Sequence, residues 1–403
     1  MKLKRSSPVL NAVASLLFLN AAWLAALSLN DAYGAECDFS LYTTIDSSGR
    51  HLIHLPAGTY TISRTIVLSS NTTLEGEGEA TVLRNSRDFR GPQFITNRDH
   101  QYGNANITLR SFRAEIVTAS IPLTAEPGIL RFESVENLNI DALVLSVDSP
   151  MYAVDLSSHI RNAAVERCNI TNKGSGGGLM IRNSDSRLGH LTSDVSVRNN
   201  RIESFQDEPI AAFGWEGAME DVSIENNTVE AHNASFGICT YGIDSKKNRG
   251  TIRTVRMAAN RIRGSRIGGI AAKGGARSIE VTANTIEDSR GDGIFLHSGG
   301  EGLPGVQEIT IRQNTILRAG RHCIFAAGNK IRIDGNVING CSQSGIYAAG
   351  DVSVTNNDIT NAAPGIMMDG VRRENVVGNT LHTGAGIITL NKDGSVSKSE
   401  DSR

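Results

Sequence analysis

Aromatic residues are scarce in this chain, at 5% of its 403 residues. That is little for the core of a large globular domain, because aromatic side chains bury the largest apolar areas. No long linker rich in proline and serine divides the chain, and the net charge is only −2. Glycine, in contrast, is plentiful at 41 residues. This balance favours one long repetitive domain over two ordinary globular domains.

Paired cysteine motifs are also absent. None of the five cysteines forms a C-x-x-C pair, which excludes the common zinc and redox motifs. Cys323 and Cys341 lie about one repeat apart and are the best candidates for a disulfide in an oxidising compartment. The odd number leaves at least one thiol free or paired externally. We expect no metal and no organic cofactor.

The two ends of the chain differ in composition from the rest. Lys2, Lys4 and Arg5 precede an apolar run over 13–29, and small residues follow near Ala35. This pattern is typical of a signal peptide over 1–35, although the run is also about as long as a short membrane anchor. We therefore expect a periplasmic or secreted protein without a membrane span after cleavage. The polar tail over 391–403 is predicted to be disordered.

One asparagine recurs, always two residues before an aliphatic side chain. The intervals between its copies fall between 21 and 33 residues, a spacing typical of a solenoid with loops on some coils. The copies are Asn200, Asn227, Asn260, Asn284, Asn314, Asn336, Asn357 and Asn379. Asparagine tolerates the left-handed backbone region, so we expect it at a corner, with its amide bonded to the copies above and below.

A second phrase accompanies each asparagine, for example "GGIAAKG" from Gly268 and "DGIFLHSG" from Asp292. Both phrases alternate with period two, which predicts short strands, and no coil has room for a helix. Stacked parallel strands with Ile, Val and Leu inward predict an all-β, right-handed parallel β-helix over 36–390, with residues 36–60 as a cap. The alternative is a β-sandwich in which the asparagines fall in loops by chance.

The segment "HLPAGTYTISRTIVLSSNTTLEGEG", which starts at His54, resembles the entry segment of the pectate-lyase-like superfamily. This resemblance extends over almost all of 50–390 and implies the same β-helix fold. The fold alone names no function, because enzymes and scaffolds share it. Function must therefore come from outward residues in one column of strands.

Such a column follows from aligning the third residue after the inward aliphatic residue of each phrase. Its members would lie about 4.8 Å apart per coil, along a groove that suits a long polymer. The polar and aromatic members lie in the middle coils: Arg182, Phe213, Tyr241, Lys273 and His297. The later members are Ala327, Ala349 and Asp369.

Positive charge is concentrated between Asp244 and Glu280, where ten Lys and Arg residues occur and no acidic residue does. We expect these charges to form a local positive field, although a set of solvated surface charges is the alternative. An acidic polysaccharide fits better than nucleic acid, because the stretch has few aromatic residues and the protein is expected to be exported.

A uronate polymer suggests proton abstraction at C5, next to the sugar carboxylate. This reaction needs a cation to stabilise the enolate-like state, a base, and an acid. The acid either protonates the leaving oxygen, giving a lyase, or returns a proton to the other face, giving an epimerase. Tyr241, Lys273 and His297 include the required types, with Arg182 and Arg249 nearby and Phe213 and Glu208 as further substrate-binding candidates.

The stretch "YGIDSKKNRG" from Tyr241 resembles the Tyr-Gly-Ile-Asp motif of periplasmic mannuronan C5-epimerases. That family continues Pro-His-Asp-Arg, and its histidine is taken as the catalytic base. Tyr241 and Asp244 match the motif, Lys246 stands at the histidine position, and Arg249 comes one residue late. The resemblance implies a site on this coil, with Lys246 or His297 as the base.

Two other functional classes remain open. A glycoside hydrolase would use carboxylates, for which Glu208, Asp244 and Asp292 are candidates, but the Gly-His-Gly and Asn-Thr-Asp phrases of polygalacturonases are absent. A calcium-dependent lyase would need acidic residues on adjacent coils. A non-catalytic guard of exopolysaccharide, working with other proteins of that pathway, would show the same groove without turnover.

Overall fold

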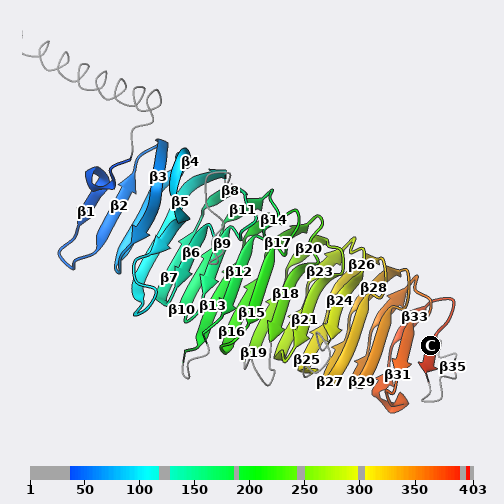
Figure 1. The fold of residues 1–403 in the computed structure, drawn as a ribbon. Coiled ribbons are helices and arrows are strands. Elements are labelled where there is room, and N and C mark those ends of the chain that lie inside the picture. Colours follow the sequence, from blue (N-terminus) through cyan, green and yellow to red (C-terminus); the bar gives the residue numbers. More distant parts are fainter. Residues whose placement is uncertain are drawn as a thin grey trace, which may run out of the picture.

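The chain folds as a long parallel β-helix, which runs from the N-terminal coils to the C-terminal coils (Figure 1). The computed structural model describes residues 37–117, 128–185, 190–242, 250–297, 305–390 and 396–399. The segment expected to be a signal peptide, 1–35, lies outside these residues. Each coil passes in turn through three faces, which we call A, B and C. The parallel β-helix expected from the repeats is confirmed.

The strands of each face pair in parallel with the same face of the next coil. Face A holds β6 (Leu130–Glu133), β9 (Val154–Ser157), β12 (Leu179–Asn183), β15 (Ile210–Gly214), β18 (Phe236–Gly242), β21 (Gly268–Gly274), β24 (Asp292–His297), β31 (Ile366–Asp369) and β34 (Ile387–Leu390). Face B holds β7 (Val135–Asp141), β10 (Arg161–Glu166), β13 (Thr192–Arg198), β16 (Met219–Glu225), β19 (Ile252–Ala258), β22 (Arg277–Thr282), β25 (Val306–Arg312) and β32 (Val376–Val377). Face C holds β8 (Val144–Asp148), β11 (Asn169–Asn172), β14 (Arg201–Ser204), β17 (Thr228–Ala231), β20 (Arg261–Gly264), β23 (Thr285–Glu287), β26 (Thr315–Ala319), β28 (Val337–Cys341), β30 (Asp358–Thr360) and β33 (Thr380–His382). Strands β27 (Ile324–Asp334) and β29 (Ile346–Thr355) bend from face A into face B.

The first coils are built from longer strands and carry the N-terminal cap. These elements are η1 (Phe39–Tyr42), β1 (Thr43–Ile45), β2 (His51–Leu55), β3 (Gly58–Leu68), β4 (Thr72–Asn97) and β5 (Asn104–Val117). Strand β1 pairs antiparallel with β2, and Cys37, Phe39 and Tyr42 pack against the first coils of the core. This arrangement covers the open end of the β-helix, as expected for residues 36–60.

The C-terminal end of the β-helix differs from the expected disordered tail. The short helix η3 (Arg373–Asn375) precedes β32, and strand β35 (Val396–Ser399) pairs antiparallel with β34. Part of 391–403 therefore adds a strand to the last coil of face A.

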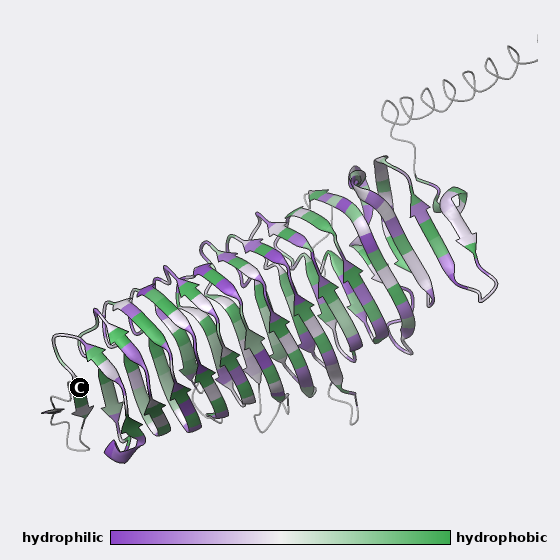
Figure 2. Cartoon of the chain, turned by 180° about the vertical axis from the view of Figure 1, so that it is seen from behind, coloured by the Kyte–Doolittle hydropathy of each residue, from purple (hydrophilic) through white to green (hydrophobic). Residues whose placement is uncertain are grey.

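The core is made of inward aliphatic side chains stacked coil on coil. On face A, Ile210, Ile238, Ile270 and Ile294 occupy one register position and are fully buried. Hydrophobic and hydrophilic residues alternate along the strands, as the period-two pattern predicts (Figure 2). The stacked small and branched residues explain how a chain with few aromatics fills a core of this length.

The recurring asparagines form a continuous buried ladder at the corner between faces B and C. Each side-chain amide donates to the amide oxygen of the next copy, over 2.8–3.0 Å, from Asn200 to Asn379. The ladder is confirmed, but its expected backbone conformation was wrong. The left-handed conformation falls on the preceding residue, such as Asn199 (φ 58°) or Ala259 (φ 53°). The asparagine is therefore required for its amide and not for its backbone.

Cys323 and Cys341 form a disulfide, with their Cα atoms 5.5 Å apart. These are the two cysteines that the spacing singled out. The bond joins the residue before β27 to the last residue of β28, so it closes one coil on itself. Cys37, Cys168 and Cys239 are free thiols.

Candidate functional site

Five of the residues predicted to form an outward column do so on face A. Parallel pairing places Arg182 beside Phe213, Phe213 beside Tyr241, Tyr241 beside Lys273, and Lys273 beside His297. The side chains alternate with buried positions and are all partly exposed. The middle of face A therefore presents two aromatic rings, an ammonium group and an imidazole on successive coils.

The ammonium group of Lys273 lies between two aromatic rings. Its Nζ atom is 4.6 Å from the ring centre of Phe236 and 5.0 Å from that of Tyr241. Phe213 packs edge-on against Tyr241, with ring centres 6.1 Å apart. Cation–π contacts of this kind orient a cation without neutralising its charge. Lys273 is thus held over face A and remains able to attract an anion.

A protonated carboxyl group lies close to this cation. Burial, followed by a hydrogen bond and charge repulsion from Asp207, raises the pKa of Glu208 to about 8, and Lys273 partly opposes this rise. The Tyr152 hydroxyl donates to Glu208 Oε2 over 3.4 Å. Two neighbouring carboxyl groups in a desolvated site share one proton in preference to holding two charges. The raised pKa therefore favours one proton on the Glu208 and Asp207 pair at neutral pH.

The charge of Lys273 also affects the pKa of a buried thiol, that of Cys239. Burial raises the pKa of Cys239 to about 12, and the charge of Lys273 opposes that rise. The Cys239 side chain is fully buried, so it is a packing partner of Phe236 and not a surface nucleophile. Burial also raises the pKa of the Tyr241 phenol.

An aromatic row continues from this cluster toward the C-terminal coils. The rings of Phe295 and Phe325 are 5.5 Å apart, and those of Phe325 and Tyr347 are 4.9 Å apart and nearly parallel. His297 stacks on Phe295, with ring centres 5.7 Å apart. Because the rings stack on one another along the axis, their faces are occupied by neighbours. This row orients His297 and does not itself offer a flat platform for a sugar.

Arg182 is at the predicted position but is engaged in an ion pair. Its Nε and Nη2 atoms donate to Asp155 over 3.1 and 3.0 Å, and Arg131 lies on the other side of that carboxylate. Burial raises the pKa of Asp155, and the positive charge of Arg182 opposes the rise. Arg182 therefore compensates a buried charge before it contributes to any ligand.

Asp292 is not presented on face A. Its side chain is fully buried at the start of β24, where its Oδ1 accepts from the His322 amide over 3.0 Å and its Oδ2 lies 3.7 Å from Arg321. Burial raises its pKa to about 6. Asp292 is also three coils from Glu208, about 14 Å at 4.8 Å per coil. The structure does not bring these two carboxyl groups together.

Four of the described arginines in the basic stretch between Asp244 and Glu280 are compensated by ion pairs. Acidic residues of the adjacent coils pair with several of its arginines. These pairs are Arg253 with Glu220, Arg256 with Glu225 and Glu280, Arg261 with Glu287, and Arg263 with Asp288, at 2.5–3.3 Å. The positive field expected here is therefore reduced at these four arginines, whose partners lie about one coil away in sequence.

Three predicted site residues, Asp244, Lys246 and Arg249, lie outside the described residues. The structure adds others that the sequence reasoning missed: Tyr152, Asp207, Phe236 and Cys239. Phe236 was visible in "FGICTYG", but it lies two residues before the inward Ile238, a spacing that predicts an inward side chain and no contact with Lys273. The burial that raises the pKa of Glu208 had no signal in the sequence.

Among the described residues, no group of three or more His, Cys, Asp or Glu side chains is arranged to hold a metal ion. Within those ranges, no helix is both long and apolar enough to cross a membrane.

The fold and the polar column on face A define a pectate-lyase-like β-helix protein. A family model described as rhamnogalacturonase A/epimerase, pectate lyase-like matches residues 40–271, which is more than half of the chain. The chain belongs to this family. A model of the right-handed β-helix region matches residues 246–401, which confirms the predicted handedness. A search of curated protein sequences found no match.

Solved structures with the same fold come from phages and bacteria. The N-terminal fragment of bacteriophage phi29 gene product 12 is 17% identical, with a TM-score of 0.58; the match covers 92% of this chain and 66% of the fragment. The Azotobacter vinelandii mannuronan C-5 epimerase AlgE4 A-module is 13% identical, with a TM-score of 0.52 and coverage of 85% and 87%. A tailspike double mutant of E. coli bacteriophage HK620 is 12% identical, with a TM-score of 0.55 and coverage of 85% and 74%. The chain spans just under two thirds of the phi29 fragment, and at these identities the likenesses show the fold alone.

Proposed function

We propose that this protein is exported and acts on an acidic polysaccharide, removing the C5 proton of a uronate unit as a lyase or a C5-epimerase. The observation that carries the proposal is the order of three side chains on consecutive coils. Lys273 lies between Tyr241 and His297 in one register column. A cation flanked by a phenol and an imidazole supplies the three group types that the reaction needs.

The charge state of the site supports an anionic substrate. Burial and the neighbouring Asp207 raise the pKa of Glu208 to about 8, which disfavours a second negative charge beside a uronate carboxylate. Lys273 keeps its charge between two rings. Tyr241 and His297 are two coils apart, about 10 Å along the axis, so a sugar ring fits between them over Lys273.

The chemical steps follow from these positions. Lys273 pairs with the sugar carboxylate, and a base takes the proton from C5, leaving the electron pair delocalised into the carboxylate. In a lyase the C4–O bond then breaks, a double bond forms between C4 and C5, and the acid protonates the leaving oxygen. In an epimerase the acid returns a proton to the opposite face of C5. Among the residues that the structure describes, His297 is the candidate for the base and Tyr241 is the candidate for the acid.

The experiment measures ultraviolet absorbance, solvent deuterium at C5 and new reducing ends on a panel of alginate, polygalacturonate and rhamnogalacturonan. A lyase raises ultraviolet absorbance, and an epimerase incorporates solvent deuterium at C5 without shortening the chain. Lys273→Met, Tyr241→Phe and His297→Gln should each lower the rate by about a hundredfold or more, as expected for losing an acid, a base or an electrostatic stabiliser. Lys330→Met, on face B and paired with Glu308, is the matched control.

A second candidate is glycoside hydrolysis with Glu208 as the acid, which its raised pKa and the rhamnogalacturonase in the family name favour. New reducing ends without ultraviolet absorbance, lost in Glu208→Gln, would establish it and exclude C5 chemistry. If no substrate shows absorbance, deuterium or reducing ends, both enzymatic proposals fail. Binding without turnover would then favour the guard function.

A further inference from the structure

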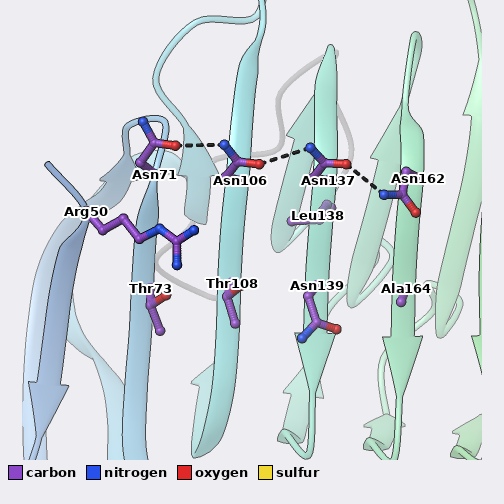
Figure 3. Close-up of a pocket in the computed structure, with 10 residues that line it drawn as sticks. All are labelled: Arg50, Asn71, Thr73, Asn106, Thr108, Asn137, Leu138, Asn139, Asn162 and Ala164. Carbon is purple, nitrogen blue, oxygen red and sulfur yellow. Dashed lines mark hydrogen bonds between the residues drawn. The ribbon is translucent and has the colours of Figure 1, made fainter. Parts of the chain in front are cut away.

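A second polar surface lies on face B of the first coils, away from the column on face A. It is a groove of about 430 Å³, which we call the amide groove, centred on Asn71, Asn106, Asn137 and Asn162 (Figure 3). These four side chains are exposed and form a ladder of their own. The amide nitrogens of Asn106, Asn137 and Asn162 each donate to the amide oxygen of the preceding coil, over 2.7–2.9 Å.

A second row of polar groups runs beside this ladder. Thr73, Thr108 and Asn139 are neighbours in register on successive coils, two residues after the ladder asparagines (Figure 3). A side-chain amide has two N–H groups, and the ladder bonds use one of them on Asn106, Asn137 and Asn162. All the amides point the same way along the axis, so their dipoles polarise one another. The result is a lattice of donors and acceptors that repeats at about 4.8 Å.

Backbone geometry alone does not require asparagine at these four positions. All four have positive φ, between 50° and 59°. On the following coils the equivalent face-B position, two residues before an outward strand residue, has the same conformation but holds Asp194, Asp221, Thr254 and Ser278. The amides are thus confined to the groove.

The groove is almost uncharged. Arg50, at one end, is the one charged residue that lines it. The charged residues of the adjacent row are paired with each other: Arg110 with Glu75, and Arg167 with Asp141. A polyanion would need a row of cations, whereas amide and hydroxyl groups hydrogen-bond the hydroxyls of a neutral sugar.

From this lattice we infer that the amide groove binds a neutral oligosaccharide along the helix axis, over about 14 Å from the first to the fourth coil. The site is separate from face A, and the inference does not depend on the chemistry proposed there. A polymer with neutral and acidic blocks could occupy both surfaces, but the neutral block alone is sufficient for binding here.

The test is affinity electrophoresis in gels that contain galactomannan, mixed-linkage β-glucan, galactan or polygalacturonate. At least one neutral polymer should retard the protein. Asn106→Asp with Asn137→Asp keeps residue types that the chain itself uses in this conformation, and should weaken that retardation by about tenfold or more, from lost hydrogen bonds and desolvated charge. Asp194→Asn with Asp221→Asn, outside the groove, is the control and should bind normally.

Two further results separate this site from face A. Lys273→Met should leave retardation by the neutral polymer unchanged, even if it abolishes activity on uronates. The inference is overturned if no neutral polymer retards the protein, if the Asn106 and Asn137 double variant still binds, or if the groove variant loses binding to polygalacturonate instead. Thermal unfolding of each variant confirms that it is folded.

Discussion

Substitution of Asn336 by alanine should destabilise the β-helix far more than its size suggests. The side chain is fully buried and uses both of its polar atoms. Nδ2 donates to the Ile311 carbonyl and to Asn357 Oδ1, and Oδ1 accepts from the backbone and side-chain nitrogens of Asn314, at 2.8–3.1 Å. Asn336→Ala therefore leaves two donors of Asn314 without an acceptor.

The expected magnitude follows from these bonds. An unsatisfied buried polar group costs about 1–3 kcal/mol, so two orphaned donors and one orphaned carbonyl amount to roughly 3–9 kcal/mol before relaxation. Neighbouring coils will move to recover part of this loss. We therefore expect a destabilisation of about 3 kcal/mol, carried by hydrogen bonding and not by apolar burial.

Asn339→Ala is the matched control, three residues further along the same coil. Asn339 also accepts a hydrogen bond from an asparagine one coil away, Asn361, over 2.9 Å, but this pair is exposed to water. Its loss should cost about 0.5 kcal/mol or less. The assay is equilibrium unfolding in urea, or unfolding rates if refolding is incomplete. Equal effects of the two substitutions would refute the reasoning.

Two further predictions concern charge. The pKa of Glu208 is raised from an ordinary 4.5 to about 8 in the folded protein, so between these values the folded protein holds a proton that the unfolded chain loses, and the free energy of unfolding should fall as pH rises. Glu208→Gln should flatten this fall in urea unfolding measured from about pH 5 to about pH 9, and an unchanged slope would contradict the assignment. The charges of Arg261 and Arg263 are already paired with Glu287 and Asp288. In affinity electrophoresis, the double variant Arg261→Gln with Arg263→Gln should therefore bind polygalacturonate nearly as well as the unchanged protein, whereas Lys273→Met should bind it more weakly. A large loss of binding in the double variant would indicate that the basic coil is the binding surface.

The sequence predicted those features that repeat in phase with the coil. The aliphatic core, the asparagine ladder and the column from Arg182 to His297 all follow from period-two alternation, because each coil places equivalent residues at one register position. The disulfide between Cys323 and Cys341 was found through the same spacing. In a repeat protein, residues at equivalent positions of successive repeats are neighbours in space, so their contacts can be inferred from the sequence.

Features that depend on contacts between coils were not predictable in this way. The arginines from Arg253 to Arg263 seemed unpaired because their acidic partners lie 24–33 residues away in sequence. Asp292 has the parity of the inward Ile294, but its hydrogen bond from the His322 amide of the next coil had no signal in the sequence. The raised pKa of Glu208 depends on burial beside Asp207, which alternation does not describe.

The disulfide has a mechanical consequence. A β-helix pulled from its C-terminal end should unravel one coil at a time, because each coil holds only its neighbours. Cys323 and Cys341, 18 residues apart, turn one of these coils into a covalent hoop. Peeling from that end would release the coils beyond Cys341 freely and then meet a segment that cannot lengthen. The closed coil therefore has to detach as one unit before the coils that carry Lys273 and His297 lose their C-terminal neighbour.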